Sequence, residues 1–305
     1  MKKYPLGKSG IFISPLTLGA MSIGTDMENA RNIIDAALDA GINHIDTADL
    51  YDYGKNEEII GKILQERRNE FVITTKVGNR FYPNQTGWYW DPSKKYIMEA
   101  VKASLKRLNT DYIDFYMLHG GTIEDPMDET ISAFEDLKKE GVIRAYGLSS
   151  IRPNVIRYYA EHSSIDGVML QYNILDRRAE EELLDLLHER NISVIARGPL
   201  AKGLLSNHYQ KYLETKAKEG YLDYSYEELK QVLRQMKDIY PSSLNELAIK
   251  YVLQHPAVTT AVFGASSPIQ VEENVKLSID SPLPKDVYEQ VKRITKANIY
   301  KAHRN

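Results

Sequence analysis

The chain has 305 residues, no cysteine and a formal net charge of −3, from 39 Lys+Arg and 42 Asp+Glu. The lack of cysteine excludes disulfides, thiolate nucleophiles and Cys-ligated metal sites. The charge balance gives no electrostatic footprint for nucleic acid or an anionic membrane surface. No apolar run approaches the roughly 18 residues of a membrane span, and the N-terminus MKKYPLGKSG lacks the apolar core of a secretory signal. We therefore expect a cytoplasmic protein.

In chain order, residues 4–14 predict a hairpin around Lys8-Ser9-Gly10, placed to close the floor of a barrel. Short runs rich in Val, Ile, Tyr and Phe follow at near-regular intervals, and their length and composition predict strands buried on both faces. These runs are residues 16–21, 44–48, 71–77, 112–118, 144–149, 167–172, 193–197 and 260–264.

Amphipathic helical patterns alternate with these strands, and glycines such as Gly41 and Gly141 follow helices as expected of C-terminal caps. The predicted helices are residues 26–40, 57–67, 93–108, 128–140, 153–161, 179–190, 226–240, 242–254 and 268–279. Eight strand–helix units indicate an α/β fold: a (β/α)₈ TIM barrel forming one domain over residues 1–305. Residues 202–225 interrupt the pattern, and residues 283–300 predict an extra C-terminal helix.

Such barrels carry their chemistry at the C-terminal ends of the strands. Asp46, Tyr51, Lys76 and His119 lie at or just after the ends of three predicted strands. Each has an ordinary structural interpretation: a buried ion pair, a packing tyrosine, a core histidine. Together they predict a catalytic set, because an ammonium beside a phenol lowers the phenol's pKa and suits it to protonate an alkoxide. No side chain supplies hydride, so a nicotinamide cofactor is the natural donor.

Competing motifs are absent. The chain has neither a GxxxxGK[ST] phosphate loop nor a GxGxxG dinucleotide fingerprint. After His188 and Glu189, Ile192 stands where a zinc protease needs its second histidine, and residues 147–151 lack the closing glycine of a nucleophile elbow. We therefore predict no metal site.

The segment from Gly41 to Glu57, the Thr75-Lys76 pair and the Tyr116–His119 run resemble the aldo-keto reductase superfamily, in particular its bacterial, potassium-channel-β-like branch. The resemblance implies that Tyr51 is the general acid, that Lys76 and Asp46 tune it, and that His119 orients a carbonyl group. It also implies NADPH/NADP⁺ as the cofactor. NADH stays possible, because Gln270 stands where several branches carry an arginine for the 2′-phosphate.

The resemblance further implies a set of cofactor-binding residues in the loops after the later strands. They are Ser149, Gln171, Arg197, Gly198, Pro199, Leu200, Lys202, Gly203, Gly264, Ser266, Ser267, Gln270, Glu273 and Asn274. Aromatic residues after the third strand, Trp88 and Trp90, are candidates for an apolar wall of the substrate pocket, although packing against the rim explains them equally well.

Two other functions remain open at this point. One is a regulatory subunit that binds NADPH tightly, senses redox state and turns over little. The other is a Schiff-base lyase or aldolase that uses Lys76 as its amine. The main expectation is an oxidoreductase acting on a small-molecule carbonyl substrate, with no nucleic-acid or membrane partner. The sequence leaves the substrate, the direction of the reaction and the oligomeric state undecided.

Overall fold

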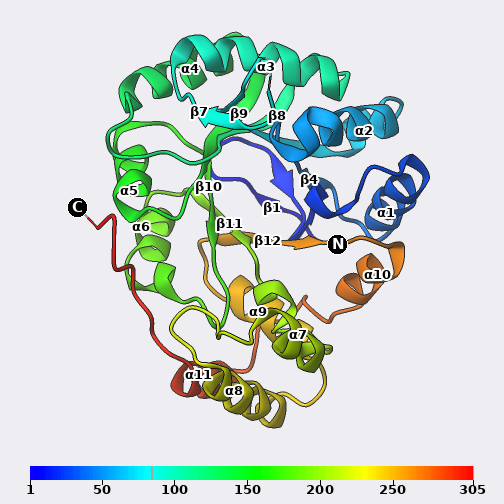
Figure 1. Cartoon of the computed structure of the whole chain (residues 1–305), viewed down its shortest axis with the longest axis vertical. Coiled ribbons are helices and arrows are strands. Elements are labelled where there is room, and N and C mark those ends of the chain that lie inside the picture. The colour runs from blue at the N-terminus through cyan, green and yellow to red at the C-terminus, as the bar shows by residue number, and fades with distance from the viewer. Residues whose placement is uncertain (84, 305) are drawn as a thin grey trace.

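The computed structural model describes residues 1–83 and 85–304, and at its centre eight parallel strands pair side by side into a closed barrel (Figure 1). Each predicted barrel strand is confirmed, with ends that agree to within two residues. The strands are β3 (Leu16–Gly19), β4 (His44–Asp46), β5 (Val72–Val77), β8 (Ile113–Leu118), β9 (Ile143–Ser149), β10 (Gly167–Gln171), β11 (Ser193–Arg197) and β12 (Val258–Gly264). The barrel closes where β12 pairs with β3.

Helices surround the barrel, as the alternating pattern predicts (Figure 1). Buried apolar side chains such as Ile33, Ile60 and Phe134 lie on their inner faces. The helices are α1 (Met27–Asp39), α2 (Lys55–Leu64), α3 (Lys94–Leu108), α4 (Met127–Lys139), α5 (Pro153–His162), α6 (Leu183–Glu189), α7 (Tyr209–Lys216), α8 (Tyr226–Ile239), α9 (Leu244–Leu253), α10 (Pro268–Val275) and α11 (Lys285–Ile294). In the described part of the chain, none of them is long and apolar enough to cross a membrane.

The N-terminal hairpin closes one end of the barrel. Strands β1 (Tyr4–Pro5) and β2 (Phe12–Ile13) pair antiparallel. Leu6 and Ile13 are fully buried and pack with Phe115 and Ile195 from the barrel strands. Because this plug fills the N-terminal end, a ligand reaches the barrel interior from the opposite end, where the strands finish.

A polar layer crosses the buried barrel above this plug. His44 contacts Thr17 Oγ1 through Nδ1 at 2.7 Å and Thr74 Oγ1 through Nε2 at 2.6 Å. Thr17 in turn bonds Thr260 at 2.7 Å, so the chain of hydrogen bonds links four adjacent strands. Burial, aided by the charge of Lys76, lowers the pKa of His44 to about 3, so this layer contains a neutral imidazole.

The structure differs from the sequence expectations in the connecting segments. The predicted C-terminal helix over 283–300 ends at Ile294, because Thr295 adopts an extended backbone conformation. The remaining residues form an irregular tail that runs from α11 towards α5 (Figure 1). The interruption at 202–225 contains α7, and the loop after β5 forms a hairpin of β6 (Asn79–Phe81) and β7 (Trp88–Trp90).

Candidate active site

The loop that carries Tyr51 is fixed at both ends. Thr47 extends the ladder of β4 by donating its N–H to Thr74 O at 2.8 Å. Its hydroxyl donates to Asn56 Oδ1 at 2.6 Å, and Asn56 donates to Ala20 O at 2.8 Å. These buried hydrogen bonds anchor the turn between β4 and α2. Tyr51 begins a short 3₁₀ turn in that loop.

Lys76 lies at the centre of the set and is 1% exposed. Its ammonium is 2.8 Å from Asp46 Oδ2, 2.7 Å from Thr47 O and 3.3 Å from Tyr51 Oη. Three acceptors use the three N–H donors of the ammonium, so the buried charge is fully hydrogen-bonded. Burial alone lowers the pKa of Lys76, but Asp46 and Tyr51 outweigh it and raise that pKa above its ordinary value.

The structure corrects one expectation about Tyr51. Burial raises the pKa of Tyr51, and Lys76 opposes that rise without reversing it. The sequence identified the opposing effect of the ammonium but not the larger effect of burial. The Tyr51 phenol therefore holds its proton throughout the neutral pH range, and the ammonium is placed to stabilise the phenolate once that proton leaves.

His119 lies beside Tyr51, directly after β8. Its backbone N–H donates to Val77 O at 2.7 Å, and its ring meets the Tyr51 ring edge-on with centroids 6.0 Å apart. Burial, together with Lys76 and Arg197, lowers the pKa of His119 to about 3, so the ring is neutral. Its buried Nδ1 has no hydrogen-bond partner among the described residues. Buried polar atoms without a partner are uncommon in folded proteins, and a catalytic role is one of the explanations for them.

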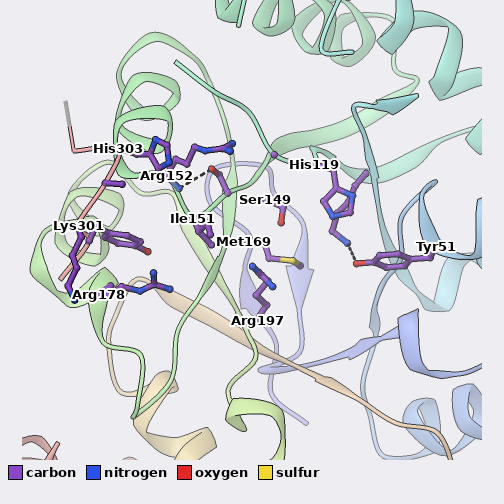
Figure 2. A pocket seen from close by; sticks show the side chains of 15 residues that line it. Tyr51, His119, Ser149, Ile151, Arg152, Met169, Arg178, Arg197, Lys301 and His303 are labelled. Atoms are coloured by element: carbon purple, nitrogen blue, oxygen red, sulfur yellow. Dashed lines mark hydrogen bonds between the residues drawn. The ribbon is translucent and has the colours of Figure 1, made fainter. Parts of the chain in front are cut away.

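These side chains face a cavity of about 520 Å³ at the C-terminal end of the barrel (Figure 2). Figure 2 shows Tyr51 and His119 on one side of this cavity and the tail residues Lys301 and His303 on the other. We call it the catalytic cavity. Its lining residues are Tyr51, Lys76, His119, Gly120, Ser149, Ser150, Ile151, Arg152, Met169, Arg178, Arg197, Tyr300, Lys301, Ala302 and His303.

A second cavity of about 580 Å³ meets the first at Tyr51, Met169 and Arg197. We call it the long groove, because it extends from Tyr51 to α10. It collects most of the residues that the resemblance assigned to the cofactor: Gln171, Arg197, Gly198, Pro199, Leu200, Lys202, Gly203, Gly264, Gln270, Glu273 and Asn274. Lys216 from α7 also lines it, although no sequence pattern pointed to that residue.

The backbone of the long groove is adapted to close approach. Gly198 has φ of +66°, and a Cβ there would lie 2.6 Å from the Gln171 side chain. Lys202 adopts the left-handed conformation with φ of 58°, which is uncommon outside glycine and is often found at ligand-binding turns. Because Gly198 has no side chain, the backbone of the loop after β11 lies close to Gln171 and borders the groove directly.

Three assigned cofactor residues lie outside the long groove. Ser149 lines the catalytic cavity instead. Ser266 and Ser267 line neither cavity: Ser267 caps α10, and the Ser266 N–H donates to Gln270 Oε1 at 2.9 Å. Their side chains contribute to the shape of the loop before α10.

The structure does not bring Trp88 and Trp90 to either cavity. Trp88 is 47% exposed on the β6–β7 hairpin. Trp90 donates from Nε1 to Asp125 at 3.0 Å, and its ring packs behind Gly120, where an added Cβ would lie 3.3 Å from it. Trp90 therefore supports the wall of the catalytic cavity from behind.

The C-terminal tail, Arg152 and Arg178 complete the catalytic cavity, and the sequence analysis did not identify them. Tyr300 was expected at the end of the C-terminal helix, and Lys301 and His303 had no helical or strand pattern to place them. Arg152 follows Ser149 by three residues in the same loop, so its position after β9 was the one available signal.

Comparison with known proteins agrees with this architecture. The model of the Aldo/keto reductase family matches residues 15–296. The chain is 51% identical to the uncharacterized oxidoreductase YqkF of Bacillus subtilis over 100% of both chains. It is 33% identical to the NADH-specific methylglyoxal reductase of Escherichia coli, covering 90% of this chain and 93% of that one. The holo form of aldo-keto reductase AKR11C1 from Bacillus halodurans superposes with a TM-score of 0.93 at 51% identity, over 100% of both chains. The chain belongs to the aldo/keto reductase family.

Proposed function

We propose that this protein reduces small aldehydes or ketones to alcohols, with a nicotinamide dinucleotide bound in the long groove and Tyr51 as the proton donor. One observation carries the proposal: the Tyr51 hydroxyl lies 3.3 Å from the buried Lys76 ammonium, at the junction of the two cavities. His119, with its unpartnered Nδ1, lies next to it.

The long groove suits an elongated, anionic cofactor. Its cationic lining residues are Arg197, Lys202 and Lys216. Its acidic lining residues are Glu273 and Asp46, and the charge of Asp46 is paired with Lys76. Arg197 belongs to both cavities, so its planar guanidinium is available to stack on a ring placed between them. A bound nicotinamide would supply a hydride to the carbonyl carbon.

The chain's own residues handle the proton. The phenol of Tyr51 donates its proton to the carbonyl oxygen as negative charge develops there, and His119 donates a hydrogen bond that orients the same oxygen. The Tyr51 phenolate that remains is stabilised by Lys76 until it recovers a proton from solvent. Asp46 holds Lys76 charged and oriented for this purpose.

The same geometry disfavours a Schiff-base mechanism. An amine must lose its proton before it attacks a carbonyl. The raised pKa of Lys76 and its three acceptors keep the ammonium protonated and fully bonded. Lys76 therefore acts as a fixed positive charge.

For the cofactor we propose NADPH, with NADH as the alternative. Lys202 and Lys216 give the groove positive charge for a further phosphate. Against this, the Gln270 side chain is engaged with Ser266 and carries no charge. The similarity to an NADH-specific enzyme supports NADH as the alternative cofactor.

The test combines two measurements on the purified protein. Fluorescence titration with NADPH and with NADH gives the two dissociation constants, and a panel of aldehydes and ketones is then screened for oxidation of the preferred cofactor. We expect saturable binding and turnover. Tight binding with no oxidation by any carbonyl would instead support the redox-sensing regulatory subunit. Borohydride trapping of a carbonyl compound on Lys76 would support the lyase.

A further inference from the structure

The catalytic cavity is lined by positive charge. Among its described lining residues, the ionisable side chains other than tyrosine are all basic: Lys76, His119, Arg152, Arg178, Arg197, Lys301 and His303. Of these, His119 is neutral. None of the lining residues is acidic. A site built only to hold neutral aldehydes has no need of this charge, because such substrates bind mainly through apolar contact.

Carboxylates outside the cavity already neutralise three of these groups. Lys76 pairs with Asp46. Arg178 makes a bidentate pair with Asp176, at 2.7 and 2.8 Å. Lys301 lies 2.7 Å from Asp223. These pairs leave little net charge from those side chains for a ligand.

Arg152 and Arg197 are different, since neither has a carboxylate within ion-pair distance in the described part of the chain. The Arg152 guanidinium donates to the backbone carbonyl of Gly121, which leaves most of its five N–H donors available. Hydrogen bonds from its own backbone and from Thr122 lower the pKa of Glu124, and Arg152 adds a smaller effect; Glu124 is exposed and screened by water. Arg197 also faces the long groove, where the cofactor is proposed to lie.

Arg152 lies in the catalytic cavity on the side away from Tyr51 (Figure 2). It is partly buried in the loop between β9 and α5, and it contacts Gly121, two residues after His119. A substrate whose carbonyl oxygen lies at Tyr51 and His119 would extend its other end towards Arg152 within the same cavity. Figure 2 shows Arg152 near the tail residue His303, away from Tyr51.

We propose that the substrate carries a carboxylate or phosphate group at the end remote from its carbonyl carbon, and that Arg152 binds this anion. This inference rests on the proposed carbonyl reduction and names its substrate class. A guanidinium suits the task because its planar donors pair with two oxygens of a carboxylate or phosphate at once. The backbone contact to Gly121 orients the guanidinium before the substrate arrives.

The experiment compares substrates matched in length but not in charge. The pairs are succinic semialdehyde with butanal, for a carboxylate, and glyceraldehyde 3-phosphate with glyceraldehyde, for a phosphate. We expect kcat/KM of the native protein to favour at least one anionic member by about 10-fold or more, as a charged hydrogen-bonded pair allows. Which pair shows the larger ratio identifies the anion. Ratios near one for both pairs would overturn the proposal.

Variants assign the effect to Arg152. Arg152→Gln should reduce the anionic-to-neutral ratio by about 10- to 100-fold, mainly through KM, and Arg152→Lys should restore part of it. Arg234→Gln removes an exposed arginine on α8 and should leave the ratio unchanged. Equal losses for the two members of a pair in Arg152→Gln would indicate a structural role and overturn the assignment.

A binding measurement separates this inference from the proposed function. Calorimetric titration of the protein–NADP⁺ complex with sodium succinate and with inorganic phosphate requires no turnover. We expect saturable binding of at least one anion, weakened about 10-fold or more by Arg152→Gln. If the protein reduces neutral aldehydes but binds neither anion, the proposed function stands and this inference is wrong. A protein that binds an anion at Arg152 but oxidises no cofactor would contradict the proposed function and the substrate class that rests on it, and would retain only the anion site at Arg152.

Discussion

The buried ion pair of Lys76 and Asp46 gives a sharp prediction about stability. Replacing Lys76 with methionine keeps most of the side-chain volume but removes the ammonium. Asp46, which is 4% exposed, then loses the cation that compensates its burial, and Thr47 O and Tyr51 Oη each lose a donor. Breaking a buried pair by removing one partner costs about 3–5 kcal/mol. We expect Lys76→Met to lower the free energy of unfolding by that amount.

The assay is urea unfolding of the protein without added cofactor, followed by circular dichroism and analysed by linear extrapolation. The matched control is Lys276→Met, which breaks an exposed pair with Glu272 and should change stability by less than about 0.5 kcal/mol. The double variant Asp46→Asn/Lys76→Met should lose at least about 2 kcal/mol less than the sum of the single variants. A cost below about 1 kcal/mol for Lys76→Met, or additive losses, would refute the assignment of a buried, coupled pair.

Three further predictions test other parts of the structure. The pKa of His44 is about 3 in the folded protein and near 6.5 when unfolded, so its stabilising effect is complete above pH 6.5 and is lost as pH falls towards 3. The difference in unfolding free energy between the native protein and His44→Gln should therefore shrink by about 2 kcal/mol between pH 7 and pH 5. A difference that stays the same at both pH values in urea unfolding would contradict this. Leu6→Ala should destabilise the plug by about 2–5 kcal/mol in the same assay, because Leu6 is fully buried; a loss under 1 kcal/mol would show that the plug is dispensable. Gln270→Arg should tighten NADPH binding relative to NADH by about 10-fold in fluorescence titration, and an unchanged ratio would place the 2′-phosphate elsewhere.

The sequence predicted the barrel and the grouping of Asp46, Tyr51, Lys76 and His119 because both depend on local patterns. Eight β-rich runs separated by amphipathic helices leave few arrangements other than a closed barrel. Once the barrel is assumed, Asp46, Lys76 and His119 must share one rim, since each follows or ends a parallel strand. The structure brings these side chains and Tyr51 together as the pattern required.

The remaining features depend on packing that no local pattern encodes. The sequence predicted a helix up to residue 300, whereas the chain leaves the helix at Thr295, so only the folded chain shows that Tyr300 and His303 line the catalytic cavity. The direction of the Tyr51 pKa shift follows from burial, which the sequence does not reveal. Trp90 resembled a pocket residue by composition, but its hydrogen bond to Asp125 holds it behind Gly120.

The most direct test of the central claim is the pair of measurements on Tyr51→Phe: single-turnover oxidation of bound cofactor by an aldehyde, and the dissociation constant of the cofactor. The variant removes one hydroxyl and keeps the ring against His119. We predict that the reduction rate falls by about 10²- to 10⁴-fold, as expected for loss of a general acid, while cofactor affinity changes less than about threefold. A reduction rate within a factor of a few of the native protein would contradict the role of Tyr51 as proton donor.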